Sequence, residues 1–115
     1  MAKSTITIEV ELDEQKIPSN IEWKATGSTV EKPQQAKAIM LSLWDGADKA
    51  ALRIDLWTGK MMVNEMADFY YQTLMTMADT FQRATQLTDL TNEMKAHAQQ
   101  FYRKFQEIQL QHNKA

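Results

Sequence analysis

The sequence predicts an α+β fold, in which a four-stranded antiparallel sheet (a meander) is followed by two α-helices packed on one face. Two observations predict this class. Apolar and polar residues alternate in the first half of the 115-residue chain, whereas from residue 64 the apolar residues recur with the helical period of 3.6. Amphipathic strands that precede helices are typical of a two-layer domain. We therefore expect a single domain over residues 1–115.

The first two strands are expected at about residues 4–12 and 20–26. Alternation is unbroken from Thr5 to Leu12, and Pro18-Ser19-Asn20 supplies a turn signal before the second strand. Because each apolar residue should face another across the pair, the predicted register has Leu12 opposite Ile21, Val10 opposite Trp23 and Ile8 opposite Ala25.

Residues 26–35, which include Gly27, Ser28, Thr29 and Pro33, predict a long loop. Two further strands, at about 37–45 and 50–58, are expected to form a hairpin around Gly46. With Leu43 opposite Leu52, one face of this hairpin is entirely aliphatic, and we expect that face to belong to the core.

Two helices are expected at about residues 64–84 and 88–109. Asn64 is a plausible N-cap, and Glu65 and Asp68 in the first turn suit the helix dipole. The last turns, from Gln109 to Ala115, are expected to fray. The predicted apolar stripes are Met66, Phe69 or Tyr70, Leu74, Met77, Phe81 and Ala84 on the first helix, and Leu90, Met94, Ala98, Phe101, Phe105 and Ile108 on the second.

Composition removes most catalytic options. The chain has no cysteine and only three glycines, and its two histidines, His97 and His112, are not at metal-ligand spacing. No serine lies in a nucleophile elbow, and no glycine-rich loop follows a strand. We therefore expect no enzyme activity, no catalytic residue, no cofactor and no metal. Asp79 is expected to pair with Arg83 one helical turn away.

The second face of the later hairpin carries the candidate site. A one-sided sheet should present polar residues outward, yet this face combines tryptophan and methionine with a few polar side chains. We predict that it mediates self-association or holds a partner, with Arg53 and Asp55 orienting the contact. The alternative is that the C-terminal helix or the 26–37 loop covers it. The candidate interaction face comprises Ala38, Met40, Ser42, Trp44, Arg53, Asp55 and Trp57.

Charge and hydropathy limit the classes of partner that we expect. The net charge is −2 and the basic residues form no stripe, which disfavours nucleic acid. Nowhere do 18 apolar residues run together, so direct membrane insertion is not expected, and the N-terminus leads into a strand and not an apolar segment. We expect a cytoplasmic protein that forms a homo-oligomer, a dimer or higher.

The stretch from Ala36 to Thr85 resembles the gliding motility protein GldC family of the Bacteroidetes group. The runs that carry this resemblance are Ala38-Ile39-Met40-Leu41-Ser42-Leu43-Trp44-Asp45, Leu52-Arg53-Ile54-Asp55-Leu56-Trp57-Thr58, Glu65-Met66, Gln72-Thr73-Leu74, Thr76-Met77-Ala78-Asp79-Thr80 and Arg83-Ala84-Thr85, with Glu11-Leu12-Asp13-Glu14 and Ile21-Glu22-Trp23 upstream. The resemblance implies a cytoplasmic accessory protein of gliding motility, a machinery linked to type IX secretion, whose partners are proteins of that machinery. It implies no catalytic residue.

Three functional hypotheses follow. The first is a non-enzymatic accessory protein that acts by protein–protein interaction through the sheet face. The second is a client-holding export chaperone that binds unfolded proteins, because four strands followed by two helices is similar to the order in the SecB chaperones; likeness of fold order alone does not establish function. The third is a small-ligand or enzymatic domain with a pocket between helix and sheet, lined by Asp79, Arg83 and Tyr70 or Tyr71.

Overall fold

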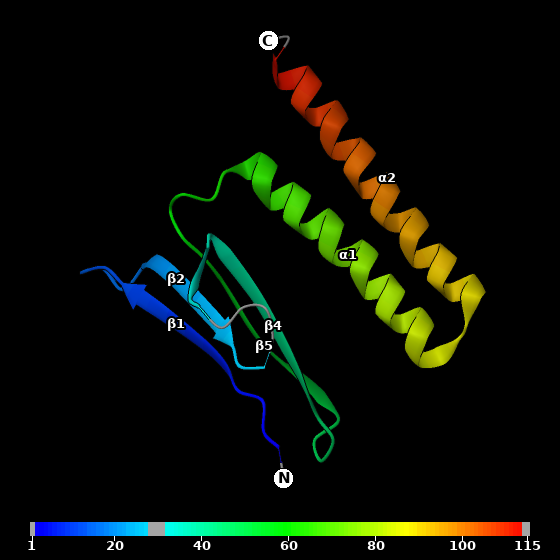
Figure 1. Cartoon of the computed structure of the whole chain (residues 1–115). Coiled ribbons are helices and arrows are strands. Elements are labelled where there is room, and N and C mark those ends of the chain that lie inside the picture. The colour runs from blue at the N-terminus through cyan, green and yellow to red at the C-terminus, as the bar shows by residue number, and fades with distance from the viewer. Residues whose placement is uncertain (1, 28–31, 114–115) are drawn as a thin grey trace. The chain divides into compact units, whose positions relative to one another are not determined.

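The structure, a computed structural model, describes residues 2–27 and 32–113 (Figure 1). The chain divides into two compact units, one that ends at Met61 and one that begins at Met62. Within the described ranges the first unit holds five strands and the second holds two helices. The elements are β1 (Ile6–Leu12), β2 (Pro18–Ala25), β3 (Gln34–Ala36), β4 (Ala38–Asp45), β5 (Ala50–Trp57), α1 (Val63–Thr85) and α2 (Thr88–Asn113).

The predicted α+β class is confirmed, but the prediction of one four-stranded sheet is wrong. The strands form two antiparallel sheets, one with the order β1-β2-β3 and one made of β4 and β5. Packing of the helices on one face of a sheet, and the single domain, stay predictions.

The turn between β1 and β2 ends earlier than predicted, because β2 begins at Pro18 and not at residue 20. One carboxylate oxygen of Asp13, Oδ1, accepts hydrogen bonds from the backbone N–H groups of Gln15 and Ile17, at 2.8 and 2.9 Å. Lys16 takes the left-handed conformation, with φ 63°, which lets the chain reverse within these residues. Pro18-Ser19-Asn20, read from the sequence as the turn, therefore belongs to β2.

This earlier turn changes the register of the first hairpin by two residues. Val10 lies opposite Ile21 and Ile8 opposite Trp23, whereas the prediction paired Val10 with Trp23. The strand pairing is irregular between Glu11 and Leu12. A shift of two residues keeps every side chain on its predicted face, because the side-chain period of a strand is two. Ile21, at 0% exposure, is the centre of this small core.

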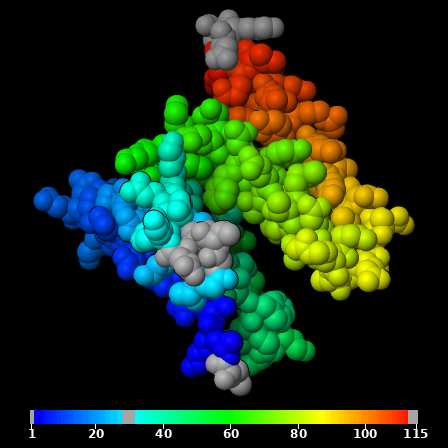
Figure 2. All heavy atoms as spheres, in the orientation of Figure 1, coloured from blue at the N-terminus to red at the C-terminus, as the bar shows by residue number. Residues whose placement is uncertain are grey.

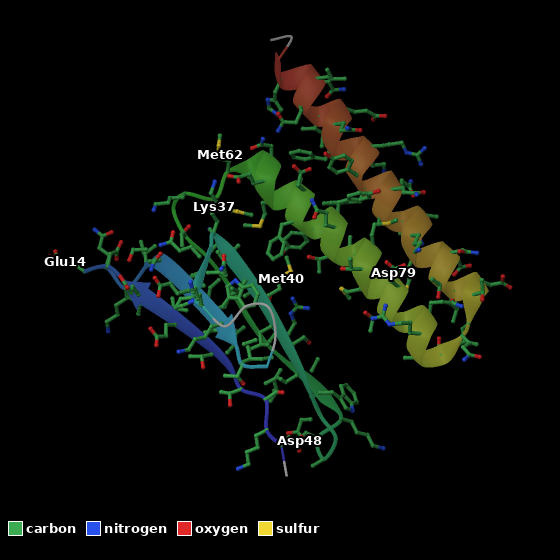
Figure 3. All side chains as sticks on the ribbon, viewed as in Figure 1. Glu14, Lys37, Met40, Asp48, Met62 and Asp79 are labelled. Atoms are coloured by element: carbon green, nitrogen blue, oxygen red, sulfur yellow. The ribbon has the colours of Figure 1, made fainter. Side chains whose placement is uncertain are left out.

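A short strand lies where a loop was predicted. Gln34–Ala36 forms β3 and pairs with β2, so that Ala36 lies opposite Ile21. Residues 28–31 of the predicted loop lie outside the described residues. At Lys37 the chain bends, and the carbonyl of Lys37 accepts hydrogen bonds from the N–H and the hydroxyl of the buried Thr58, at 2.8 and 3.1 Å (Figure 3 labels Lys37). This bend ends the pairing with β2 and begins the pairing of β4 with β5, which divides the strands into two sheets.

Strands β4 and β5 pair in the predicted register. Leu43 lies opposite Leu52, Ser42 opposite Arg53, and Ala38 opposite Trp57, with no irregularity along the ladder. At the tip, near the labelled Asp48 in Figure 3, Asp45 Oδ1 accepts the N–H of Ala47 at 2.9 Å, and Lys49 has φ 53°. Eight paired residues on each strand therefore keep two opposite faces along the whole hairpin.

The two helices form an antiparallel pair. Helix α1 begins at Val63, with Met62 as its N-cap, so the predicted N-cap Asn64 lies inside the first turn. The Met62 N–H donates to Glu65 Oε1 at 3.2 Å, which explains why an acidic residue suits this position. Helix α2 continues to Asn113, beyond the predicted start of fraying at Gln109. Residues 114–115 lie outside the described residues.

Small side chains lie where α1 and α2 are most buried. Ala78 and Ala98 are both 0% exposed, and Thr91 is 4% exposed. Several residues of the predicted apolar stripes are more exposed than these small side chains. Met77, Leu90 and Ile108 are each about half exposed. The space-filling view shows the side chains of the two helices meeting along their length (Figure 2).

Candidate functional site

The β4–β5 hairpin brings the predicted interaction face together. Regular pairing places Ala38, Met40, Ser42 and Trp44 on the same side as their partners Trp57, Asp55, Arg53 and Ala51. All seven predicted residues therefore share one face of a two-stranded sheet, and Ala51 is an eighth member. Met40 is labelled on β4 in Figure 3. We call this surface the tryptophan face.

Large aromatic side chains on this face are exposed. Trp44 is 69% exposed and Trp57 is 57% exposed, whereas Met40 and Ala38 are half-buried. Tryptophan combines a large apolar area with one N–H donor, so it is enriched where proteins bind other proteins. Both tryptophans are therefore accessible to a second molecule in this structure.

An ion pair lies on the tryptophan face. Arg53 Nη2 donates to Asp55 Oδ1 at 2.8 Å, and Arg53 Nε donates to Asp55 Oδ2 at 3.1 Å. This two-point contact fixes both side chains along β5. Its hydrogen bonds lower the pKa of the Asp55 carboxyl below its ordinary value of 3.8. Both side chains remain more than two-fifths exposed, so each can also contact a second molecule.

The opposite, aliphatic face of the hairpin is more exposed to solvent than the face of a core should be. Ile39, Leu41 and Leu56 are half-buried, but Leu43, Leu52 and Ile54 towards the tip are each more than half exposed. The sequence predicted this face as core because it contains no polar pair. Near the tip, both faces of the hairpin therefore present apolar side chains to solvent.

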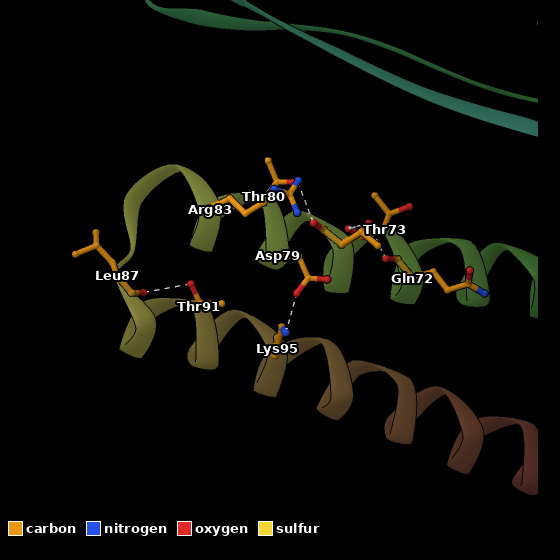
Figure 4. Close-up of polar contacts among 9 residues, drawn as sticks. Gln72, Thr73, Asp79, Thr80, Arg83, Leu87, Thr91 and Lys95 are labelled. Carbon is orange, nitrogen blue, oxygen red and sulfur yellow. Dashed lines mark hydrogen bonds and ion pairs between the residues drawn. The ribbon is translucent and has the colours of Figure 1, made fainter. Parts of the chain in front are cut away.

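Three residues of the third hypothesis, Asp79, Arg83 and Tyr71, each contact another residue of the two helices. Asp79 Oδ1 pairs with Lys95 Nζ of α2 at 2.8 Å, so the predicted pairing of Asp79 with Arg83 is wrong (Figure 4). Arg83 Nη2 donates instead to the Thr80 hydroxyl at 3.2 Å. Tyr71 stacks on Tyr102, with ring centroids 4.7 Å apart. The acid is thus engaged by a cation of the neighbouring helix, which sequence spacing within one helix could not predict.

Sequence reasoning missed Tyr102. Its hydroxyl donates to Asp68 Oδ1 at 2.7 Å, between residues 34 apart in the chain. This hydrogen bond raises the pKa of the Tyr102 phenol above its ordinary value of 10.0, because the bond requires the proton and the carboxylate repels a phenolate. Both residues line a depression of about 510 Å³ on the helical unit, together with Asn64, Phe105, Gln106, Gln109 and Leu110. A helical period alone gives no sign of such a contact.

The described residues show no arrangement for a metal ion. Within residues 2–27 and 32–113 there is no cluster of three histidine, aspartate or glutamate residues that could bind one. His97 and His112 are both exposed on α2. In the same ranges, neither helix combines the length and apolarity that crossing a bilayer requires.

Comparison with known proteins identifies one family. Residues 18–107 match the family described as "Gliding motility-associated protein GldC-like". The match extends past Thr85, the end of the resemblance seen in the sequence, and covers most of α2. Searches of curated proteins and of solved structures found no match.

Proposed function

Because the chain belongs to the GldC-like family of gliding motility-associated proteins, we propose that it is a non-enzymatic, cytoplasmic accessory protein that binds other proteins of the gliding machinery. The binding surface is the tryptophan face of the β4–β5 hairpin. Arg53 and Asp55 orient the partner through hydrogen bonds, and Trp44 and Trp57 supply the apolar contact area.

One observation carries the proposal. Two exposed tryptophans flank a fixed ion pair on one face of a regular hairpin. Interfaces obtain most of their binding free energy from a few aromatic and arginine residues, surrounded by smaller contacts that exclude water. The tryptophan face has this composition, with Ala38, Ala51 and Ser42 as the smaller residues.

The test compares two neighbouring residues on opposite faces. Trp44→Glu places a charge on the tryptophan face, and Leu43→Glu places the same charge on the aliphatic face of the same strand. Both side chains are more than half exposed, so both variants should fold, which circular dichroism would verify. Each variant replaces the native gene in a gliding bacterium, and colony spreading is measured together with co-purification of gliding proteins.

We expect Trp44→Glu to abolish spreading and co-purification, and Leu43→Glu to retain both. Met40→Glu, on the tryptophan face, should behave like Trp44→Glu. If folded Trp44→Glu and Met40→Glu proteins support normal spreading, the tryptophan face is not the working surface.

A client-holding role is the second candidate, and the exposure of Leu43, Leu52 and Ile54 favours it. Chaperones of this kind hold unfolded chains on apolar surface. The purified protein would then slow the aggregation of several unrelated denatured proteins at stoichiometric amounts, and Leu43→Glu and Trp44→Glu would both weaken that effect. No effect of the native protein on any of these substrates would remove this candidate.

A further inference from the structure

No strand within residues 2–27 and 32–113 pairs with the outer edge of β5, the edge away from β4. Among the described residues β5 pairs only with β4, and every β5 residue except Leu56 is exposed. Proteins usually protect such an edge with proline, lysine, a bulge or a covering segment. Strand β5 contains no proline or lysine, and its pairing with β4 has no irregularity. An edge of eight residues without proline, lysine or a bulge is suited to pairing with another strand.

The hydrogen bond from Thr58 to Lys37 shows which backbone groups lie on this edge. Thr58 directs its N–H towards the chain that leads into β4. Because backbone direction alternates along an antiparallel strand, Leu52, Ile54 and Leu56 also direct their N–H and C=O groups towards β4. The N–H and C=O groups of Ala51, Arg53, Asp55 and Trp57 are therefore directed away from it, to the outer edge.

We propose that β5 pairs antiparallel with β5 of a second copy of this chain, with Ile54 on the two-fold axis. This register places Arg53 opposite the partner's Asp55 and Asp55 opposite the partner's Arg53. It also places Leu52 opposite the partner's Leu56, and Ala51 opposite the partner's Trp57. The outward-directed residues pair with one another, as an antiparallel ladder requires. The inference rests on the proposed function only in treating the hairpin as a contact surface.

Charge complementarity selects this register and this edge. Each arginine has an aspartate beside it on its own strand and another opposite it, so four charges alternate in sign around a square. Moving the two-fold axis to Arg53 or to Asp55 places like charges opposite each other. Strand β1, at the edge of the other sheet, contains Glu9 and Glu11, so a symmetric pairing centred among those residues would bring glutamates together.

Pairing through β5 would also extend the tryptophan face. The joined sheet would have the order β4-β5-β5-β4, and each Ala51 would lie between Trp44 of its own chain and the partner's Trp57. A small residue between two large ones allows the indole rings to cover it. The partner-binding surface would then be continuous across both copies, as expected for a symmetric interface.

A charge exchange tests the pairing on the full chain, using sedimentation velocity to measure mass. Arg53→Asp leaves acidic residues at both 53 and 55, so two copies of this variant would bring like charges together. Asp55→Arg leaves basic residues at both positions, with the same effect. We expect the native protein to have the mass of two chains and each single variant the mass of one. Mixing the two single variants should restore the mass of two chains, because opposite charges then face each other only between chains.

The mixture separates the proposed contact from the ion pair within one strand, because each single variant lacks that internal pair. Circular dichroism must show that each variant is folded. A native protein with the mass of one chain, or a folded mixture that stays at the mass of one chain, would overturn the proposal.

A cysteine substitution tests the register. The chain has no cysteine, so Ile54→Cys introduces a single thiol at the proposed axis. Ile54 and its symmetry mate would form a non-hydrogen-bonded pair of an antiparallel ladder. The Cα atoms of such a pair are about 4.5 Å apart, within the range of a disulfide. Leu52→Cys is the matched control, because its thiol is similarly exposed but its Cα lies about 14 Å from that of its symmetry mate.

Under mild oxidation, Ile54→Cys should form a covalent dimer and Leu52→Cys should stay a single chain. Equal cross-linking of the two variants would exclude this register. These outcomes are independent of the gliding assay. A chain that fails to cross-link while Trp44→Glu abolishes gliding would refute the self-pairing and leave the proposed function intact. Cross-linking at Ile54 together with normal gliding of the Trp44→Glu strain would support the self-pairing and refute the proposed function.

Discussion

The charge state of Asp55 depends on its hydrogen bonds with Arg53. Because Arg53 stabilises the carboxylate, the pKa of Asp55 lies below 3.8. The contribution of the pair to stability is therefore present above pH 3.8 and is lost as the pH falls through the lowered pKa. We predict that Arg53→Gln raises the Asp55 pKa towards 3.8, measured by carbon NMR of the carboxyl group. Lys49→Gln removes a cation at the tip of the same hairpin and should leave the Asp55 pKa unchanged; equal shifts would refute the specific role of Arg53.

Tyr102 contributes through its hydroxyl and through its ring. Tyr102→Phe removes the 2.7 Å hydrogen bond to Asp68 but retains a ring against Tyr71. We predict a lower urea midpoint for Tyr102→Phe than for the native chain. Tyr70→Phe, at a residue that is 45% exposed, should leave the midpoint unchanged.

The pH dependence of Tyr102 follows from the raised pKa of its phenol. The phenol must hold its proton to donate to Asp68, so its contribution is present below pH 10 and is lost as the pH rises through the raised pKa. The difference in midpoint between native protein and Tyr102→Phe should therefore disappear in strong alkali. A difference that persists after the phenol has ionised would contradict this account.

Side-chain partners were predictable only where they are close in sequence or fixed by a regular strand. The tryptophan face was predicted correctly because alternation assigns residues to faces. Asp79 and Asp68 were assigned to their own helix, yet their observed contacts are Lys95 and Tyr102 on the next helix. The rotation of one helix against another decides such contacts, and a helical period does not determine that rotation.

At the scale of an element, the end of α1 is strained at one residue. Gln86 takes the left-handed conformation, with φ 57°, and its N–H donates to the carbonyl of Gln82 at 2.9 Å. Glycine adopts this conformation without a steric cost, so Gln86→Gly should stabilise the protein by about 1 kcal/mol in urea unfolding. Ala84→Gly, inside the helix, should destabilise it by about 1 kcal/mol. If both variants changed the free energy of unfolding in the same direction, this explanation would be wrong.

The buried alanines limit the size of side chains between the elements of the helical unit. Ala98 has 0% exposure, so Ala98→Leu must displace its neighbours, and we predict a loss of about 1–3 kcal/mol in urea unfolding. Ala96→Leu adds the same atoms to an exposed residue of α2 and should change stability by less than about 0.5 kcal/mol. Equal effects would mean that the site of Ala98 can accommodate a larger residue.

Elements with a repeated pattern were predicted better than their connections. The β4–β5 register was predicted because only one alignment pairs every aliphatic residue. Strand β3 was missed because Pro33, Gln34 and Gln35 resemble a loop, and its pairing depends on β2, which is distant in sequence. The end of the first turn was misplaced because Asp13 closes the turn, accepting the N–H of Lys16 on its carbonyl and that of Gln15 on Oδ1, whereas Pro18 gave the stronger sequence signal.

At the scale of the whole molecule, the class and the family were predictable and the division of the sheet was not. Residues 36–85 carried the resemblance, and the family match over residues 18–107 confirms it. The bend at Lys37 divides the predicted sheet. The Lys37 carbonyl accepts hydrogen bonds from Thr58, and from there β4 pairs with β5. The bend leaves β5 with an outer edge that pairs with no other strand of the described chain.

If two copies pair through β5, stability must depend on protein concentration. Unfolding then separates two chains, so each tenfold rise in concentration adds about 1.4 kcal/mol to the apparent stability of the dimer. We predict a thermal midpoint that rises over a roughly hundredfold range of concentration. Oxidised Ile54→Cys should lose this dependence, because its chains stay joined, and reduction should restore it. Leu52→Cys should keep the dependence under both conditions. A native midpoint that stays constant over this range would show that each chain folds without its copy.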